Sequence, residues 1–436
     1  MDTTQMIPPG DQDRTKMVGS PSGDRTSMYS AQALTLECIP GNSYGLSTEL
    51  TREHALVTIR STDAAVGGRM PLNLCLILDR SGSMEGEPLD YAKRACAYVV
   101  DLLQPNDVLS IVTFEEQVEI VMPARRVVNR ELVKQHIYRI EPGNTTNLYD
   151  GIAAGCSQIA SVSAGGYVNR ALLLTDGEPT AGNKDFGSIV SQVEEQKSRG
   201  ITVTALGFGS EYNEELLAGI ARRSGGNYYY ITRPDLIPEI FRRELESLMT
   251  VVARNLRLRV KLPRWVQVRQ IYGKQPTFGG NTAEVTLSDL ERGSIETALV
   301  ELAFDSRPAG TYRVAKIELS YDDSVSGRTE SLTADAVVEF TPDQSLVEQG
   351  INPAVQRELE VALASRALEK TVMGMRTQQI SPAVAIQELE RTRTILLQQG
   401  KNTQAQDVQS AIDNIKDGAA AEKTLVGTIY NLDRGR

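Results

Sequence analysis

The chain of 436 residues has few of the residues on which many catalytic and metal sites depend. Only two histidines occur, His54 and His136, which disfavours a histidine base or a histidine-rich metal site. The four cysteines lie far apart without a C-x-x-C pair, so neither a zinc cluster nor a disulfide framework is expected. Such thiols fit a reducing cytoplasm, and Cys75, Cys96 and Cys156 are predicted to be core residues because they stand in apolar surroundings.

Long apolar stretches and an excess of basic charge are also missing. No run of 18 apolar residues occurs, so no membrane span is predicted, and the polar first residues are unlike a secretory signal peptide. Lys and Arg number 46 against 56 Asp and Glu, a net charge of −10, which disfavours binding to nucleic-acid phosphates. With 41% hydrophobic residues, the chain has enough apolar surface to build a sizeable core.

The alternation of apolar runs and amphipathic segments predicts a doubly wound α/β domain over residues 70–250. The expected strands are nearly continuous apolar runs, which suit a mostly parallel sheet buried on both faces. They lie at 73–78, 108–114, 171–175 and 202–208, with helices near 87–103, 148–162, 185–199 and 213–223.

Segments on either side of this domain have other periodicities. Residues 31–66 and 251–341 contain strand-like alternation and are predicted to form one antiparallel β-sandwich into which the α/β domain is inserted. Residues 345–436 are predicted to be a helical region, with three helices over 345–418. The lone Trp265 is expected in the sandwich core.

Three polar strings are candidates for a functional site. Asp79, Ser81 and Ser83 directly follow the first buried strand, and Asp176 directly follows a later one. A third string, 143–151, contains two adjacent threonines and precedes a helix. Ligand sites in open α/β sheets lie at the carboxyl ends of the strands. Carboxylate and hydroxyl oxygens are hard ligands, which select magnesium, manganese or calcium over zinc.

These residues resemble the von Willebrand factor type A (VWA) domain and its metal-ion-dependent adhesion site. The family motif D-x-S-x-S stands here as Asp79, Ser81 and Ser83, the family threonine aligns with Thr146, and the second aspartate aligns with Asp176. The resemblance implies that Ser81, Ser83 and Thr146 contact Mg²⁺, or Mn²⁺ or Ca²⁺, directly. It implies that the two aspartates act mainly through water and that an Asp or Glu of a protein partner completes the coordination. Thr145 is the alternative threonine.

The overall plan resembles prokaryotic multidomain VWA proteins and favours a cytoplasmic, non-enzymatic interaction scaffold. An ordinary polar turn is the simplest alternative for D-x-S-x-S. A hydrolase with Ser81 or Ser83 as nucleophile would need a nearby base, and neither histidine stands in a suitable context. Two further alternatives are an accessory partner of an AAA+ ATPase in complex assembly or metal insertion, and an extracellular adhesion protein.

A triple repeat marks residues 1–30, which are otherwise polar and predicted to be disordered. The pattern D-x-T-x-M followed by a bulky apolar residue recurs every 11 residues, with its threonines at Thr4, Thr15 and Thr26. An apolar or aromatic side chain three positions after each threonine resembles the phosphothreonine ligands of forkhead-associated (FHA) domains. The hypothesis is that a Ser/Thr kinase modifies these threonines and that an FHA-domain protein binds them. A low-complexity tail without a partner is the alternative.

Overall fold

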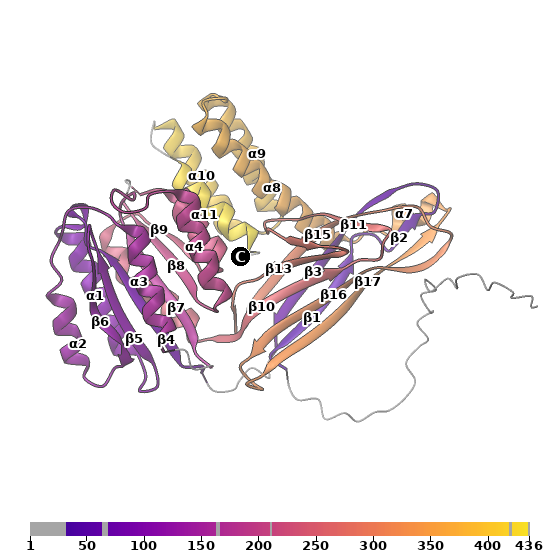
Figure 1. The fold of residues 1–436 in the computed structure, drawn as a ribbon. Coiled ribbons are helices and arrows are strands. Elements are labelled where there is room, and N and C mark those ends of the chain that lie inside the picture. The colour runs from indigo at the N-terminus through magenta and orange to yellow at the C-terminus, as the bar shows by residue number, and fades with distance from the viewer. Residues whose placement is uncertain (1–31, 63–68, 163–165, 210–211, 418–420, 435–436) are drawn as a thin grey trace, which may run out of the picture.

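The structure is a computed structural model that describes residues 32–62, 69–162, 166–209, 212–417 and 421–434 (Figure 1). The repeat threonines Thr4, Thr15 and Thr26 lie outside the described residues. An α/β domain, a β-sandwich and a helical region stand side by side, with the helical region above the junction of the other two in the view of Figure 1.

The α/β domain is built on a six-stranded sheet in the order β6-β5-β4-β7-β8-β9. All neighbours are parallel except β5 and β6, which are antiparallel. The strands are β4 (Leu72–Asp79), β5 (Val108–Phe114), β6 (Val118–Arg126), β7 (Val168–Thr175), β8 (Thr202–Phe208) and β9 (Tyr228–Ile231). Every residue of β4 is buried, as the prediction of a sheet covered on both faces requires.

Helices cover both faces of this sheet, which confirms the doubly wound α/β fold. Alternate residues of β4 enter two separate cores: Leu74 and Leu76 pack under one helical layer, and Cys75 and Ile77 pack under the other. The first layer consists of α1 (Glu87–Leu102), α2 (Arg130–Tyr138) and α6 (Ile237–Leu248). The second consists of α3 (Leu148–Ala160), α4 (Phe186–Ser198) and α5 (Glu214–Ser224).

The β-sandwich consists of two antiparallel sheets, apart from one short parallel pairing between β17 and β2. The first sheet has the order β1 (Leu34–Pro40), β3 (Thr51–Ser61), β15 (Ile295–Phe304), β11 (Val266–Ile271). The second has the order β12 (Thr277–Gly279), β13 (Thr282–Thr286), β10 (Val251–Lys261), β16 (Gly310–Asp323), β17 (Thr329–Thr341), β2 (Tyr44–Leu46), with β14 (Leu290–Glu291) beside β10. Since β1 to β3 precede the α/β domain and the other strands follow it, the α/β domain is an insertion within the sandwich.

Trp265 lies between β10 and β11 and packs on the sandwich core, as predicted. Its indole ring meets Phe304 and Phe340 edge-on, with ring centroids 6.1 and 6.0 Å apart. Arg307 lies over the same ring, 4.5 Å from its centroid. The sole tryptophan is therefore a packing residue that joins the two sheets at one end of the core.

The helical region contains more helices than the three that the sequence predicted. In the described residues it comprises α7 (Gln344–Gln349), α8 (Pro353–Arg376), α9 (Pro382–Gln398), α10 (Asn402–Lys416) and α11 (Glu422–Asp433). The predicted starts are confirmed, because the side chains of Asn352 and Ser381 cap α8 and α9 ahead of a proline. The short α7 escaped prediction because it is a single turn and a half with no buried residue.

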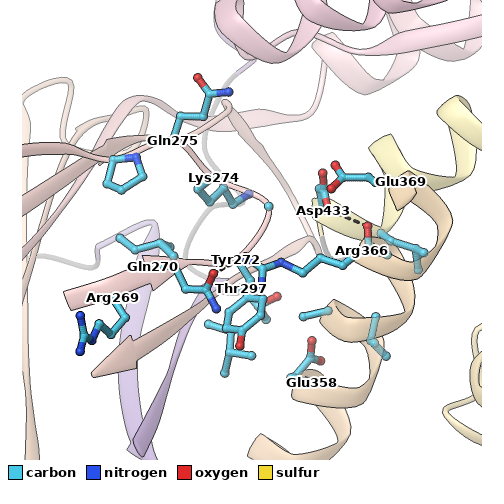
Figure 2. Close-up of a pocket in the computed structure, with 18 of the residues that line it drawn as sticks. Arg269, Gln270, Tyr272, Lys274, Gln275, Thr297, Glu358, Arg366, Glu369 and Asp433 are labelled. Atoms are coloured by element: carbon cyan, nitrogen blue, oxygen red, sulfur yellow. Dashed lines mark hydrogen bonds between the residues drawn. The ribbon is translucent and has the colours of Figure 1, made fainter. Parts of the chain in front are cut away.

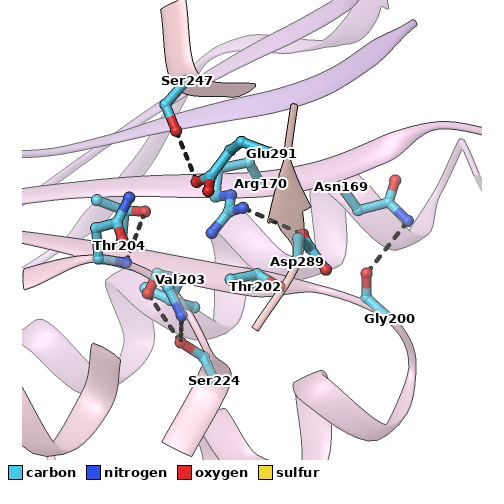
Figure 3. Close-up of polar contacts among 12 residues, drawn as sticks. Asn169, Arg170, Gly200, Thr202, Val203, Thr204, Ser224, Ser247, Asp289 and Glu291 are labelled. Atoms are coloured by element: carbon cyan, nitrogen blue, oxygen red, sulfur yellow. Dashed lines mark hydrogen bonds and ion pairs between the residues drawn. The ribbon is translucent and has the colours of Figure 1, made fainter. Parts of the chain in front are cut away.

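Buried polar contacts join the sandwich to the α/β domain near the amino ends of its strands (Figure 3). Arg170 in β7 pairs with Asp289 at 3.1 Å, and the Lys197 ammonium lies 4.0 Å from the same carboxylate. The Ser247 hydroxyl donates to Glu291 at 2.8 Å. The sandwich thus packs against the α/β domain at the amino ends of the strands. The carboxyl ends of β4 and β7 lie at the opposite side of the domain.

Ion pairs of opposite polarity hold the two ends of α5 against the helical region. At its start, Glu214 pairs with Arg376 at 2.5 Å and with Lys423 at 3.1 Å. At its end, Arg222 pairs with Asp433 at 3.0 Å. Because α5 begins just after the carboxyl end of β8, the helical region reaches the edge of the α/β domain where the parallel strands end.

Close packing of α3 on β4 makes Gly155 sensitive to substitution. An added Cβ at Gly155 would overlap the Ile77 side chain in the centre of the sheet, so Gly155→Ala is expected to lower the free energy of unfolding by about 1–3 kcal/mol. Gly427→Ala in α11 is the matched control, since its Cβ would lie 3.9 Å from Tyr228. That control should be neutral or stabilising by up to about 1 kcal/mol. Urea denaturation measures both, and equal effects would contradict the packing described.

Candidate metal centre

The five oxygen-bearing residues that the sequence singled out stand on three chain segments. Asp79 is the last residue of β4, and Ser81 and Ser83 lie in the loop that follows it, around the 3-10 turn η2 (Gly82–Met84). Asp176 directly follows β7, the parallel neighbour of β4. Thr146 lies two residues before α3. Parallel pairing of β4 and β7 brings their carboxyl ends, and therefore the two aspartates, to one edge of the sheet.

The structure brings the two serine hydroxyls onto one oxygen of Asp176. Ser83 Oγ donates to Asp176 Oδ1 at 2.8 Å, and Ser81 Oγ lies 3.5 Å from the same atom. The two hydroxyls are 3.2 Å apart. Ser81 and Asp176 are buried, whereas Ser83 is exposed, so the cluster opens to solvent on the side of Ser83.

Asp79 has no exposed surface and is held from both sides. The Thr175 hydroxyl donates to Asp79 Oδ2 at 2.5 Å, and the Ser81 backbone N–H donates to Asp79 Oδ1 at 2.8 Å. Burial raises the pKa of Asp79 to about 6, against the lowering effect of the hydrogen bonds from Thr175 and Ser81. The nearby Asp176 carboxylate raises this pKa further. The surroundings of Asp79 thus favour a compensating positive charge.

Thr146 lies next to Gly177, the residue that follows Asp176. Its backbone is fixed by Thr180, whose hydroxyl accepts from the Thr146 N–H at 2.9 Å and whose N–H donates to the Thr146 carbonyl at 3.0 Å. Its Oγ1 would lie 3.5 Å from a Cβ built on Gly177, the residue after Asp176. Thr146 is 4% exposed, and the neighbouring Thr145 has a buried hydroxyl without a hydrogen-bond partner among the described residues.

Backbone hydrogen bonds tie the loops around this cluster together. The Arg80 N–H donates to the Phe114 carbonyl at 3.0 Å, which links the loop after β4 to β5. The Gly143 N–H donates to the Arg80 carbonyl at 2.5 Å, and the Gly82 N–H donates to the Asn144 carbonyl at 3.3 Å. The loop before α3 is thereby docked against the loop that carries the serines. This docking uses backbone groups alone and needs no contribution from the side chains of Ser81, Ser83 or Thr146.

The donor set fits a hard divalent cation and not a soft one. It consists of two carboxylates and three hydroxyls, and Mg²⁺, Mn²⁺ and Ca²⁺ prefer such oxygen ligands. Across the described part of the chain, no group of three or more His, Cys, Asp or Glu side chains is arranged as a metal cluster. The thiols are equally unsuited, because Cys75 and Cys156 are buried and burial raises the pKa of each to about 12. These cysteines and Cys96 are core residues, as predicted.

Sequence reasoning missed Thr175, which holds Asp79 in place. Thr175 was read only as the last residue of a buried strand. Its hydroxyl is directed at the neighbouring strand, which only the parallel pairing of β7 with β4 reveals. A polar residue closing an apolar run next to a site residue is the signal that could have found it.

Two cavities lie elsewhere, at the junctions between the three parts. One, of about 380 Å³, lies between β11 and α8, where Arg366 covers the ring of Tyr272 at 4.7 Å (Figure 2). The other, of about 780 Å³, lies between the ends of α4 and α5 and the sandwich. Neither contains any of the five site residues. Among the described helices, none combines the length and the apolarity that crossing a bilayer requires.

Comparison with known proteins agrees with this architecture. The family model of the von Willebrand factor type A domain matches residues 73–243. An uncharacterized Synechocystis protein, sll0103, is 29% identical over 316 residues, which cover 67% of this chain and 74% of that protein. The uncharacterized protein YfbK of Escherichia coli is 30% identical over 244 residues, which are 54% of this chain and 42% of YfbK. The chain therefore spans less than half the length of that relative.

A solved structure extends the likeness beyond the matched domain. A von Willebrand factor type A protein from Catenulispora acidiphila superposes with a TM-score of 0.74 at 17% identity, over 87% of this chain and 89% of that one. Residues 73–243 therefore form a VWA domain, within an architecture that the Catenulispora protein shares. Domains of this type typically mediate protein interactions and often bind a divalent metal.

The hydrogen bond from Thr175 to Asp79 is expected to contribute measurably to stability. Thr175→Val removes a donor to a buried carboxylate and should lower the free energy of unfolding by about 1–3 kcal/mol. Thr113→Val is the matched control, because Thr113 is a buried strand residue whose hydroxyl has no partner in the described structure. Denaturant unfolding without divalent metal measures both variants. An effect of Thr175→Val no larger than that of Thr113→Val would show that Asp79 does not depend on this contact.

Proposed function

We propose that the VWA domain is a metal-dependent docking module that binds a protein partner through a carboxylate of that partner. The observation that carries the proposal is the convergence of the Ser81 and Ser83 hydroxyls on Asp176 beside the buried Asp79. Three hydroxyls and two aspartates at the open edge of a sheet form a polar site with the ligands of a hard cation. The proposal gives a role to the polar side chains at the carboxyl ends of β4 and β7.

Each residue has a distinct part in this function. Ser81, Ser83 and Thr146 offer neutral oxygens to the ion, while Asp79 and Asp176 supply the negative charge that attracts it. Thr175 and the Ser81 N–H keep Asp79 fixed. A bound Mg²⁺ would supply a centre of positive charge with exchangeable water ligands, one of which an incoming Asp or Glu replaces. Mn²⁺ or Ca²⁺ could bind the same oxygen ligands.

The proposed module is not an enzyme. A serine nucleophile needs a base, and the histidines lie on other elements: His54 in β3 of the sandwich and His136 in α2. His54 is engaged there, with its Nε2 3.4 Å from the Tyr272 hydroxyl. Four free thiols support a cytoplasmic setting for the scaffold. The two alternatives are an accessory partner of an AAA+ ATPase in complex assembly or metal insertion, and an extracellular adhesion protein. Identifying the bound protein decides between them and the scaffold.

Metal binding is the first requirement of this function. Mn²⁺, which substitutes for Mg²⁺ and is visible by electron paramagnetic resonance, should bind the wild-type protein at one site. Asp79→Asn keeps the shape of the side chain and removes its charge, and should weaken binding on the order of 10–100-fold. Asp90→Asn, on the exposed side of α1, is the matched control and should bind as the wild type does. Equal Mn²⁺ affinity of the two variants would contradict the assignment.

We further infer that the amino-terminal repeat is a phosphothreonine docking arm for an FHA-domain protein. The support is the sequence: three copies at 11-residue spacing would each gain about −1.5 to −2 charges on phosphorylation, and their linkage would raise avidity. A Ser/Thr kinase is implied by the same reasoning.

The arm is tested with protein phosphorylated on Thr4, Thr15 and Thr26. Native mass spectrometry with an isolated FHA domain should show binding to the phosphorylated protein and none to the Thr→Val triple variant. Phosphorylation of these sites in the native host should be detected by peptide mass spectrometry. If the fully phosphorylated protein and the triple variant bind the FHA domain equally, the inference fails.

A further inference from the structure

The cavity of about 780 Å³ between the ends of α4 and α5 and the sandwich is lined by more cations than anions. Three carboxylates line it, against six Lys and Arg side chains: Lys197, Arg199, Arg222, Arg223, Arg257 and Lys274. This excess occurs in a chain whose net charge is −10, so the cavity differs in charge from the molecule as a whole.

Ion pairs within the chain account for four of these cations and leave two. The pairs are Arg199 with Glu195 at 2.6 Å, Arg222 with Asp433 at 3.0 Å, Arg223 with Glu194 at 3.3 Å and Lys274 with Glu296 at 2.6 Å. The other two lining carboxylates are also engaged, because Glu284 accepts from Arg259 at 2.7 Å and Asp322 accepts from Asn255 at 2.6 Å. The excess positive charge of the cavity therefore belongs to Lys197 and Arg257.

Lys197 has fewer good contacts than its burial requires. The residue is 8% exposed, and its ammonium lies 3.5 Å from the Thr202 hydroxyl and 4.0 Å from the Asp289 carboxylate. Asp289 is shared with Arg170, which lies closer to it, at 3.1 Å (Figure 3). An ammonium has three N–H donors, and a buried charge is costly unless it is paired and hydrogen-bonded. An anion beside Lys197 would therefore be stabilising.

Arg257 adds a second positive charge to the same part of the cavity. It is exposed on β10, and no ion pair of the described structure includes it. Burial has the largest effect on the pKa of Lys197, which it lowers; Asp289 opposes this, and nearby guanidinium groups, that of Arg257 among them, lower the pKa further. This repulsion means that the two cations lie close enough to act on one anion.

The amino-terminal repeat joins the described structure beside this cavity. The Ala33 N–H donates to the Asp323 carboxylate at 2.8 Å, and the residue before it in β16, Asp322, lines the cavity. Thr26 precedes Ala33 by seven residues, and seven residues of extended chain span up to about 25 Å. The last threonine of the repeat is therefore within reach of the cavity.

Phosphorylation would give the repeat the charge that the cavity lacks. Residues 1–31 contain four Asp against one Lys and two Arg, a side-chain charge of 3 − 4 = −1. A phosphate on Thr26 would add about −1.5 to −2 charges and three acceptor oxygens. Because the unmodified segment is nearly neutral, its attraction to the cavity would depend on the phosphate.

We propose that the phosphorylated Thr26 segment of the chain's own amino-terminal repeat docks in this cavity, with its phosphate on Lys197 and Arg257. The inference rests on the phosphorylation proposed above and adds an intramolecular site that competes with the FHA-domain protein. A short tether holds the phosphate at an effective concentration on the order of millimolar, so even a weak site fills. The docked segment bridges the α/β domain and the sandwich, since both line the cavity. Docking thus withholds Thr26 from the partner.

Binding in trans tests the phosphate site. The probe is a fluorescein-labelled peptide of residues 22–31 with phosphothreonine at Thr26, added to the unphosphorylated full-length protein. At low salt, fluorescence anisotropy should show this peptide binding roughly tenfold or more tightly than its unphosphorylated form, because the phosphate gains charge-assisted hydrogen bonds. Inorganic phosphate, used as a competitor, should bind more weakly than the phosphopeptide, because it lacks the contacts of the flanking residues.

Substitutions on β10 locate the effect. Arg257→Gln should weaken binding of the phosphopeptide by roughly tenfold, and Arg257→Lys should restore most of it, because it keeps the charge. Arg259→Gln is the matched control, since Arg259 is exposed on the same strand but pairs with Glu284 and does not line the cavity. The control should bind the phosphopeptide as the wild type does.

Competition in cis tests the regulatory consequence. The protein is full-length and carries phosphothreonine at Thr26 alone, introduced by semisynthesis. The second pKa of phosphothreonine is about 6 when free, and ³¹P NMR should show it lower in the wild type than in Arg257→Gln, because nearby cations stabilise the dianion. An isolated FHA domain should bind the phosphorylated wild type several-fold more weakly than phosphorylated Arg257→Gln.

The outcomes separate the cavity from the docking arm. Equal binding of the two peptides, or equal losses in Arg257→Gln and Arg259→Gln, would overturn the phosphate site. Inorganic phosphate binding as tightly as the phosphopeptide would overturn the assignment of the cavity to the repeat. A phosphothreonine pKa unchanged by Arg257→Gln would overturn docking in cis. If the FHA domain binds neither phosphorylated form, the docking arm fails, while the anisotropy and NMR measurements, which use no FHA domain, still decide the cavity.

Discussion

A carboxylate without exposed surface, at the end of the central strand, is the constraint around which the α/β domain is arranged. Asp79 is the last residue of β4, and burial alone would make its charge costly. The chain offsets this cost locally, with the Thr175 hydroxyl from β7 and the Ser81 N–H. Because Thr175 also directly precedes Asp176, the parallel pairing of β4 with β7 fixes both aspartates at once. The serine loop follows β4 directly, and the loop before α3 docks on it through backbone hydrogen bonds.

Polar contacts join the sandwich and the helical region to the α/β domain. The sandwich meets the domain through Arg170 and Asp289, toward the amino ends of the strands. The helical region holds α5 through Glu214 at one end and Arg222 at the other. Acidic and basic side chains of the α/β domain both take part in these junctions.

The sequence predicted the parts of the fold that depend on local patterns. Continuous apolar runs identified β4, β5, β7 and β8, since strands of a parallel sheet are buried on both faces. It missed β6 and β9 for physical reasons: β6 is an antiparallel edge strand of mixed polarity, and β9 has four residues, three of them tyrosines. The D-x-S-x-S string and its resemblance to the VWA family located the site. The hydrogen bond of Thr175 and the ion pairs of α5 join residues that are distant in sequence, so no local pattern predicts them.

A crystal structure of the protein soaked in Mn²⁺ tests the central claim most directly, because anomalous scattering places the ion independently of the protein atoms. The account predicts one strong anomalous peak about 2.0–2.3 Å from the hydroxyl oxygens of Ser81 and Ser83, with Thr146 and the two aspartates around it. In that structure the hydrogen bond between Ser83 and Asp176 gives way to metal contacts. A fully occupied peak elsewhere, or none, with the hydroxyl of Ser83 still donating to Asp176, would contradict the account.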